Sequence, residues 1–166
     1  KNLMKLCKFV GILIVAVLSS CANRSNTVAI VIDEDSYSAV KDAVGTYCNA
    51  ISRYDGKNTE LIVVDKSVAP RVIRDTLIML YDSKSLEGTV LIGDIPIPMI
   101  RKAHHLATAF KMNPDSDWMD SSIPSDRFYD DFGLDFKFPK NEERNPLLYY
   151  YDLTSKGPNN QLVTRI

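Results

Sequence analysis

The chain has 166 residues, which is room for one ordinary domain. Hydrophobic residues make up 45% and charged residues 25%, so disorder, collagen and coiled coil are excluded as the main architecture. Its 20 basic and 21 acidic residues give a net charge of -1, which argues against a nucleic-acid partner. The three cysteines are too few and too scattered for a disulfide framework or a zinc site. No metal and no cofactor are expected.

The first twenty residues have the pattern of a secretory signal peptide. A basic start, ending at Lys8, precedes an apolar run of ten residues over 9–18. That run is too short for a membrane span, which needs about 20 apolar residues. A basic segment followed by an apolar stretch of this length is typical of a signal peptide, predicted here over residues 1–20.

The signal peptide ends in a motif that resembles the bacterial lipobox. Leu18-Ser19-Ser20-Cys21 places an aliphatic and two small residues before a cysteine. The resemblance implies that Cys21 becomes the lipidated N-terminus and that residues 21–26 form a tether to the membrane. We therefore expect a lipid-anchored protein of the cell envelope, in the outer membrane of a Gram-negative bacterium. The alternative is an N-terminal helix of a soluble domain with Cys21 as an ordinary small residue.

Strand and helix patterns alternate along the next part of the chain. Three apolar, β-branched runs over residues 27–32, 60–65 and 88–94 predict strands buried on both faces. Helical spacing predicts helices over 37–54, with Ser36 as N-cap, and over 69–81. We predict an α/β fold with a mostly parallel sheet flanked by helices, like the caspase and flavodoxin folds.

The helical faces and strand ends carry specific expectations. Helical spacing places the following apolar residues toward the core: Val40, Val44, Tyr47, Cys48, Ile51, Val72, Ile73, Leu77 and Leu80. Each predicted strand ends on an acid, namely Asp33, Asp65 and Asp94. Since ligands collect at the carboxyl edge of a parallel sheet, these acids are either helix caps or site residues.

The chain changes character after residue 98. We expect an acidic, aromatic insertion over about 99–152, in which residues 113–152 hold ten acids against four bases. Residues 99–110 fit a short helix or a hairpin arm, and residues 147–153 fit a strand. Residues 161–166 fit the start of a fourth core strand, which, with the missing initiator Met, suggests a fragment with an incomplete domain.

No nucleophile and base can be paired from the residues present. His104 and His105 are adjacent and fit a polar surface, and Cys48 fits core packing, where a buried thiol is inert. The spacing Asp115-x-Asp117-x-x-Asp120 is similar to a calcium loop, but it lacks the glycine and the distal glutamate of an EF-hand. A solvated acidic loop is the simpler interpretation.

Two motifs resemble the gingipain-type cysteine peptidases of the caspase clan. They are residues 88–96 (GTVLIGDIP) and residues 123–131 (IPSDRFYDD), and residues 161–166 stand where the family has a further strand with Gly-Arg. The resemblance covers about residues 85–166 and departs from the family in the long spacer over 99–122 and in Thr164, where glycine is usual. It makes residues 27–166 the N-terminal part of such a domain.

The resemblance also implies where the chemistry lies. The catalytic Cys and His follow the Gly-Arg strand in the family, so no catalytic residue is expected in this chain, and this fragment alone is expected to be inactive. Asp126 matches an aspartate beside the substrate pocket, and with Asp94 it is the candidate for binding a peptide or protein substrate. The alternative for Asp126 is a turn-forming aspartate.

Two other functions remain open. Residues 28–35 (VAIVIDED) are similar to the strand and Asp-x-Asp of haloacid-dehalogenase-like phosphatases, in which Asp33 would attack phosphorus. Against this, Pro98 stands where that family has another Asp, and Asp65-Lys66 where it has Ser or Thr. The other alternative is a non-catalytic surface lipoprotein that binds a protein or glycan through its tyrosine- and acid-rich edge.

The lipid anchor is directly testable. We expect mass spectrometry of the membrane fraction to find a mature N-terminus at Cys21 carrying acyl chains, because only the cysteine of a lipobox is both acylated and exposed by cleavage. A mature N-terminus elsewhere, or an unacylated Cys21, would refute the anchor.

Overall fold

The computed structural model describes residues 26–102 and 115–154. Several sequence predictions lie outside these residues and stay predictions: the signal peptide, Cys21, all but the last residue of the tether over 21–26, the histidine pair and the strand over 161–166. Among the described residues no helix is both long and apolar enough to cross a membrane.

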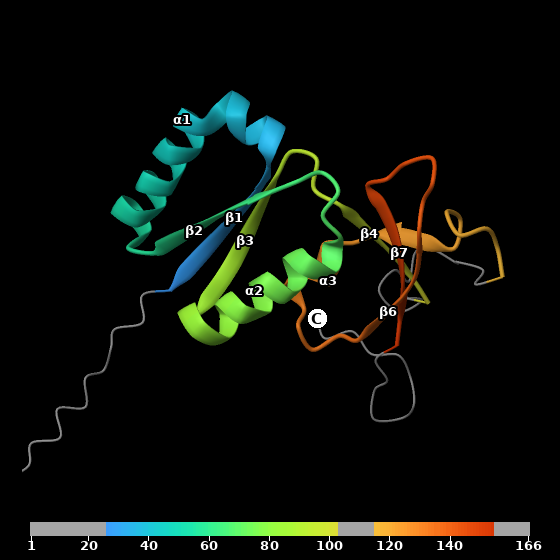
Figure 1. Ribbon diagram of the computed structural model, residues 1–166. Helices are drawn as coiled ribbons and strands as arrows, with labels where there is room; N and C mark the ends of the chain where they lie inside the picture. Colours follow the sequence, from blue (N-terminus) through green and yellow to red (C-terminus); the bar gives the residue numbers. More distant parts are fainter. Residues whose placement is uncertain (1–25, 103–114, 155–166) are drawn as a thin grey trace, which may run out of the picture.

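The first half of the described chain forms a parallel sheet between two helices (Figure 1). Its strands are β1 (Thr27–Asp33), β2 (Asn58–Val64) and β3 (Leu86–Ile92), in the order β2-β1-β3, and β1 pairs in parallel with both neighbours. The predicted α/β class is confirmed. Helix α1 (Glu34–Ala50), which continues as the π-helical turn η1 (Ile51–Asp55), covers one face, and α2 (Pro70–Lys84) covers the other.

Helix α1 begins directly after β1 because Asp33, the last residue of the strand, caps the helix. The carboxylate of Asp33 accepts hydrogen bonds from the backbone N–H groups of Asp35 (3.1 Å) and Ser36 (3.0 Å). The predicted cap at Ser36 is therefore wrong: the helix starts before Ser36, and a strand-end aspartate satisfies its free N–H groups.

The predicted core face of α1 is only partly buried. Val44 and Ile51 are buried and Cys48 is half-buried, but Val40 and Tyr47 are 41% and 45% exposed. Val40 has non-helical φ/ψ angles of -125° and 20°, which kink the helix. The kink falls within the helix that periodicity predicts as continuous.

Helix α2 follows its predicted pattern more closely. Pro70 occupies the first turn, where its missing N–H costs nothing, and Ile73, Leu77 and Leu80 are buried against the sheet. The prediction is wrong for Val72, which is 56% exposed.

Burial on both faces holds for β1 alone. Residues 29–32 of β1 are fully buried, whereas the edge strands are partly open: Leu61 and Val63 of β2 are 42% and 40% exposed. The continuous apolar run therefore predicts strand identity correctly and overestimates burial at the sheet edges.

The acidic and aromatic part of the chain contributes a second, mixed sheet. Its elements are β4 (Ile97–Arg101), β5 (Ser122–Pro124), α3 (Arg127–Asp130), β6 (Phe136–Asn141) and β7 (Leu148–Leu153). The strand order is β5-β4-β7-β6; β4 and β7 are parallel, and both outer pairs are antiparallel. The predicted strand over 147–153 is confirmed as β7.

One hydrophobic core joins the second sheet to the α2 face of the first. Aromatic rings fill the part nearest the second sheet: the centroids of Phe128 and Tyr151 are 4.3 Å apart, and those of Phe128 and Phe136 are 5.0 Å apart. Burial raises the pKa of Tyr151 to about 12. Many aromatic residues of the acidic stretch therefore serve packing between the two sheets.

A buried arginine fastens α2 to the loop after α3. Arg74 is 4% exposed, and its guanidinium donates hydrogen bonds to the carbonyl oxygens of Phe128, Asp131 (3.0 Å) and Leu134 (2.9 Å). Its Cζ lies 5.2–5.7 Å from the centroids of three phenylalanine rings, namely Phe128, Phe132 and Phe136. The three hydrogen bonds from the Arg74 guanidinium therefore fix the path of the chain over residues 128–134.

Replacing Arg74 tests this connection. Arg74→Met should lower the free energy of unfolding by about 3 kcal/mol, because it leaves three carbonyl groups without their donor inside the core. Arg71→Met is the matched control on the same helix: Arg71 is exposed and pairs with Asp75 at 3.1 Å, so its loss should cost about 0.5 kcal/mol. Urea unfolding measures both, and equal effects would contradict the role of Arg74.

Candidate functional site

The carboxyl ends of β1 and β3 are joined by the side chain of Asp33. One oxygen of this carboxylate caps α1, and the other accepts a hydrogen bond of 2.8 Å from the N–H of Asp94, directly after β3. The residue is 1% exposed. Hydrogen bonds from the hydroxyl and N–H of Ser36, and from the N–H groups of Asp94 and Asp35, lower the pKa of Asp33 to about 2. Asp33 is thus a structural carboxylate with both oxygens occupied.

Gly93 is required at this junction. Its φ of +80° lies in the region that favours glycine, and a Cβ there would fall 1.9 Å from Oδ2 of Asp33 and 2.3 Å from the Ser36 hydroxyl. The Gly-Asp pair of the 88–96 motif therefore has a physical role: glycine lets the turn reach the buried carboxylate.

The other strand-end acids have separate partners. Asp65 accepts hydrogen bonds from the N–H (2.7 Å) and hydroxyl of Ser67, which closes the turn after β2. Asp94 is exposed, and Lys66 bridges it (3.4 Å) to Asp35 (2.8 Å). The carboxylate of Asp35, and secondarily that of Asp94, raises the pKa of Lys66. Of the three acids, Asp94 alone presents an exposed carboxylate with only a side-chain ion pair.

The two segments of the gingipain-like motif lie against each other. The N–H of Ser125 donates to the carbonyl of Pro98 (3.0 Å), and the buried hydroxyl of Tyr129 donates to the carbonyl of Pro96 (2.7 Å). Burial raises the pKa of that hydroxyl, so Tyr129 stays protonated and remains a donor. The two motif segments are therefore in contact although residues 99–122 separate them in the sequence.

Asp126 is placed at the start of α3 with an exposed side chain. Its carbonyl accepts a hydrogen bond from the N–H of Tyr129 (2.7 Å), but its carboxylate does not cap the helix. Its backbone is therefore fixed next to the Pro96–Pro98 segment, while its carboxylate points to solvent. Both predicted substrate-binding residues, Asp94 and Asp126, are exposed acids on these contacting segments.

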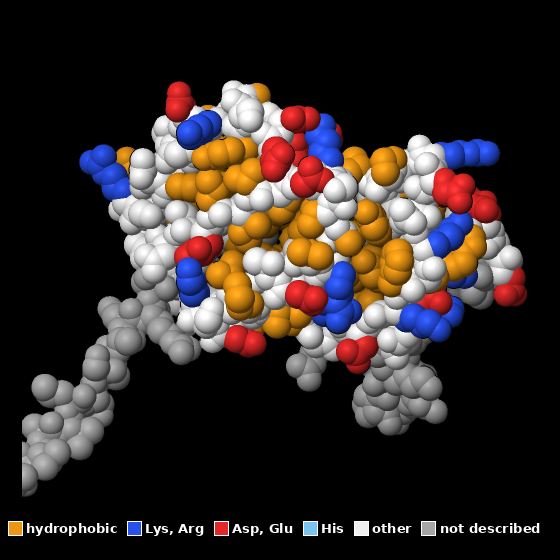
Figure 2. Space-filling view, viewed as in Figure 1, with side chains coloured by type: hydrophobic (Ala, Val, Ile, Leu, Met, Phe, Trp, Pro, Cys, Tyr) orange, Lys and Arg blue, Asp and Glu red, His pale blue; other side chains and the backbone are white. Residues whose placement is uncertain are grey.

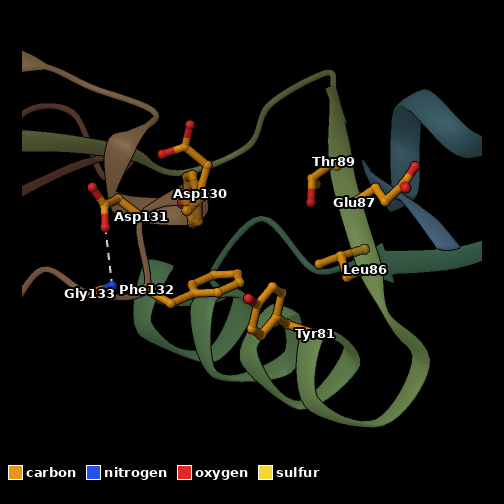
Figure 3. Close-up of a pocket in the computed structure, with 10 residues that line it drawn as sticks. Tyr81, Leu86, Glu87, Thr89, Asp130, Asp131, Phe132 and Gly133 are labelled. Atoms are coloured by element: carbon orange, nitrogen blue, oxygen red, sulfur yellow. Dashed lines mark hydrogen bonds between the residues drawn. The ribbon is translucent and has the colours of Figure 1, made fainter. Parts of the chain in front are cut away.

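A cavity of about 400 Å³ lies between β3 and the loop after α3 (Figure 3). Leu86, Tyr81 and Phe132 form its apolar side, where the two aromatic rings meet edge to face at 5.3 Å. Thr89 extends from β3 toward the opening. Sequence analysis missed this cavity because its two walls are 40 residues apart in the chain.

The rim of this cavity is acidic. Asp130 and Asp131 line it, and Asp131 accepts a hydrogen bond from the N–H of Gly133 (3.1 Å). Glu87 also lies at the rim, but its carboxylate forms an ion pair with Lys57. Desolvation, with the nearby Asp131 and Asp126 charges, raises the pKa of Asp130. The rim therefore favours a basic group over an anion.

A second cavity of about 460 Å³ lies beside β6 and is mostly aromatic. Its walls include Phe136, Phe138, Tyr149 and Tyr151, with Arg71 at the edge. Figure 2 shows that hydrophobic side chains gather across the middle of this face of the molecule, with charged side chains around them. The cavity beside β6 could accommodate an apolar or aromatic group.

The calcium-like spacing does not form a ligand cluster. The carboxylate of Asp117 accepts a hydrogen bond from the N–H of Met119 (2.9 Å), as in an ordinary turn. Within residues 26–102 and 115–154, no three His, Cys, Asp or Glu side chains come together as metal ligands would.

Comparison of the chain with protein-family models, with curated proteins and with solved structures found no match. The class that the fold and site define is an α/β protein with a parallel sheet whose carboxyl edge is organised by a buried aspartate.

Substituting Gly93 tests that organisation. Gly93→Ala should lower the free energy of unfolding by about 2 kcal/mol or more, because alanine disfavours this φ and its Cβ displaces the carboxylate of Asp33. Gly88→Ala is the matched control in β3, since a Cβ there meets nothing within 4 Å; it should change stability by about 0.5 kcal/mol at most. Thermal unfolding of both variants measures the difference, and a neutral Gly93→Ala would contradict the analysis.

Proposed function

We propose that the chain is a membrane-anchored lipoprotein carrying the N-terminal part of a gingipain-like cysteine endopeptidase domain. The observation that supports this most is the contact between the two motif segments: residues far apart in sequence meet through Ser125 to Pro98 and Tyr129 to Pro96. Both motifs are defined by the sequence alone, and contact between them is what a shared site requires.

Asp126 carries the proposed substrate contact. Its backbone is held by α3, and its exposed carboxylate makes no ion pair within the described residues, so the carboxylate is accessible to a ligand. A carboxylate held in this way forms a charge-assisted pair with the guanidinium or ammonium group of a peptide. Asp94 adds a second negative charge on the neighbouring segment. The proposed substrates are therefore peptides with Arg or Lys at the cleavage site.

The catalytic Cys and His of the proposed enzyme belong to a segment that follows residue 166. Cys48 is a poor nucleophile, because it is half-buried between α1 and the sheet and packs with Ile30, Ile32 and Val44. The part of the chain described here supplies the sheet, the carboxyl edge and the substrate-binding acids.

A non-catalytic binding lipoprotein is the second candidate. The aromatic cavity beside β6 favours it, since Phe138 is half-exposed there and the walls are largely apolar. The phosphatase alternative has less support. Asp33, its nucleophile, uses both carboxylate oxygens as hydrogen-bond acceptors for backbone N–H groups, and Asp35 is paired with Lys66.

Peptide hydrolysis tests the enzymatic proposal. Residues 1–166 alone should not cleave fluorogenic Arg or Lys peptides, whereas the chain extended by its downstream coding sequence should. In the extended chain, Asp126→Asn should lower kcat/KM for these peptides by about 100-fold, because the bound cation loses its charged partner.

The control is Asp120→Asn, which removes an exposed acid near β5 and should leave kcat/KM unchanged. A peptide with an uncharged residue at the cleavage site should respond equally weakly to both substitutions. Cleavage by residues 1–166 alone, or full activity of the Asp126→Asn variant, would contradict the proposal.

A further inference from the structure

The cavity beside β6 contains a buried hydrogen-bond donor that is available to a ligand. Tyr151 lines this cavity and is 2% exposed, and its hydroxyl oxygen accepts a hydrogen bond from the N–H of Arg71 in the first turn of α2. Burial raises the pKa of this hydroxyl to about 12, so it keeps its proton at neutral pH. Within the described part of the chain, no group accepts that proton. Because buried donors in native proteins are nearly always paired, this hydroxyl indicates an acceptor on a bound molecule.

The other polar groups of the cavity also donate hydrogen bonds. Arg71 lies at its edge with an exposed side chain, and its ion pair with Asp75 uses Nε (3.1 Å), which leaves both terminal nitrogens able to donate. Asn141 contributes an amide group, and no acid is among the described residues that line this cavity. An anion is therefore favoured here, whereas the acidic rim of the first cavity favours a basic group.

The walls of the same cavity favour an aromatic ring. Phe136, Phe138 and Tyr149 line it, and the rings of Phe138 and Tyr149 have centroids 6.2 Å apart at an angle of 39°. Phe138 is half-exposed, so a ring that enters the cavity covers apolar surface that faces solvent. The volume of about 460 Å³ lies within the range of sites for small organic ligands.

We propose that the cavity beside β6 binds an aromatic carboxylate. The ring packs against Phe138 and Tyr149, and the carboxylate accepts hydrogen bonds from the Arg71 guanidinium and the Tyr151 hydroxyl. Both donors lie on the α2 side of the cavity, because this hydroxyl contacts the backbone of Arg71 itself. A planar carboxylate with two oxygens matches the geometry of a guanidinium.

This chemistry has two sources: a free aromatic acid and the C-terminal residue of a peptide that ends in an aromatic side chain. The site uses neither Asp94 nor Asp126, so it does not rest on the proposed peptidase activity.

Titration calorimetry of the full chain with 3-phenylpropionate tests the site. This acid should bind at least about tenfold more tightly than 3-phenylpropylamine, which has the same ring and the opposite charge. The acetylated tripeptide Gly-Gly-Phe with a free carboxylate distinguishes the two sources: comparable affinity assigns the site to peptide C-termini, and weaker affinity assigns it to a free acid. No binding of either carboxylate, or equal binding of the amine, would overturn the proposal.

Substitutions at the two donors test the predicted contacts. Arg71→Met and Tyr151→Phe should each weaken the binding of 3-phenylpropionate about tenfold, because each removes a hydrogen bond to the carboxylate. Arg71 is exposed, so Arg71→Met should keep the fold even if Tyr151→Phe disturbs the core. Wild-type affinity in either variant would contradict the assignment.

Tyr129→Phe is the matched control. The hydroxyl of Tyr129 is also buried, but it has an acceptor inside the protein, the carbonyl of Pro96 (2.7 Å). Tyr129→Phe should therefore lower the Tm by about 3 °C and leave the affinity for 3-phenylpropionate unchanged. If Tyr129→Phe weakens binding as much as Tyr151→Phe does, the effect is one of stability and the proposal fails.

Discussion

The relation between the two sheets depends on one buried cation. Within the described part of the chain, Arg74 enters the core without a carboxylate in an ion pair and is satisfied by three backbone carbonyls and three phenylalanine rings. Burial lowers the pKa of this guanidinium, but an arginine keeps its proton, so the carbonyls must remain in place around it. The loop that they belong to continues from α3. The position of Asp126 and the wall of the first cavity therefore follow from a side chain of α2.

Asp33 has the corresponding role for the first sheet, with the opposite charge. The folded-state pKa of Asp33, about 2, lies below its ordinary value of 3.8, so the ionised carboxylate stabilises the fold fully above a pH of about 4. That contribution is lost as the pH falls through the folded-state pKa. At neutral pH the carboxylate is ionised and holds both the start of α1 and the turn at Gly93. The exposed acids Asp94 and Asp126 are thus each placed by a different buried charge.

The sequence predicts the local elements well and the contacts between distant segments poorly. Periodicity is sufficient for β1, α1, β2, α2 and β3, because each has its own apolar pattern and turn residues. The burial of Arg74 could have been predicted, because helical spacing places it on the same face of α2 as Pro70, Ile73 and Leu77. Arg71 does not lie on that face. No comparable signal reports the pairing of β4 with β7, since the two strands are 47 residues apart and pairing depends on the whole second sheet.

The difference between predicted and observed burial in the first sheet is itself informative. β1, β2 and β3 have similar apolar runs, yet only the central strand is buried at every residue but one. Continuous apolar strands are typical of sheets covered on both faces and extended on both sides, because exposed apolar area costs about 25 cal/mol per Å². Leu61, Val63 and the cavity beside β3 therefore have the composition of a sheet interior at positions that the described residues leave open.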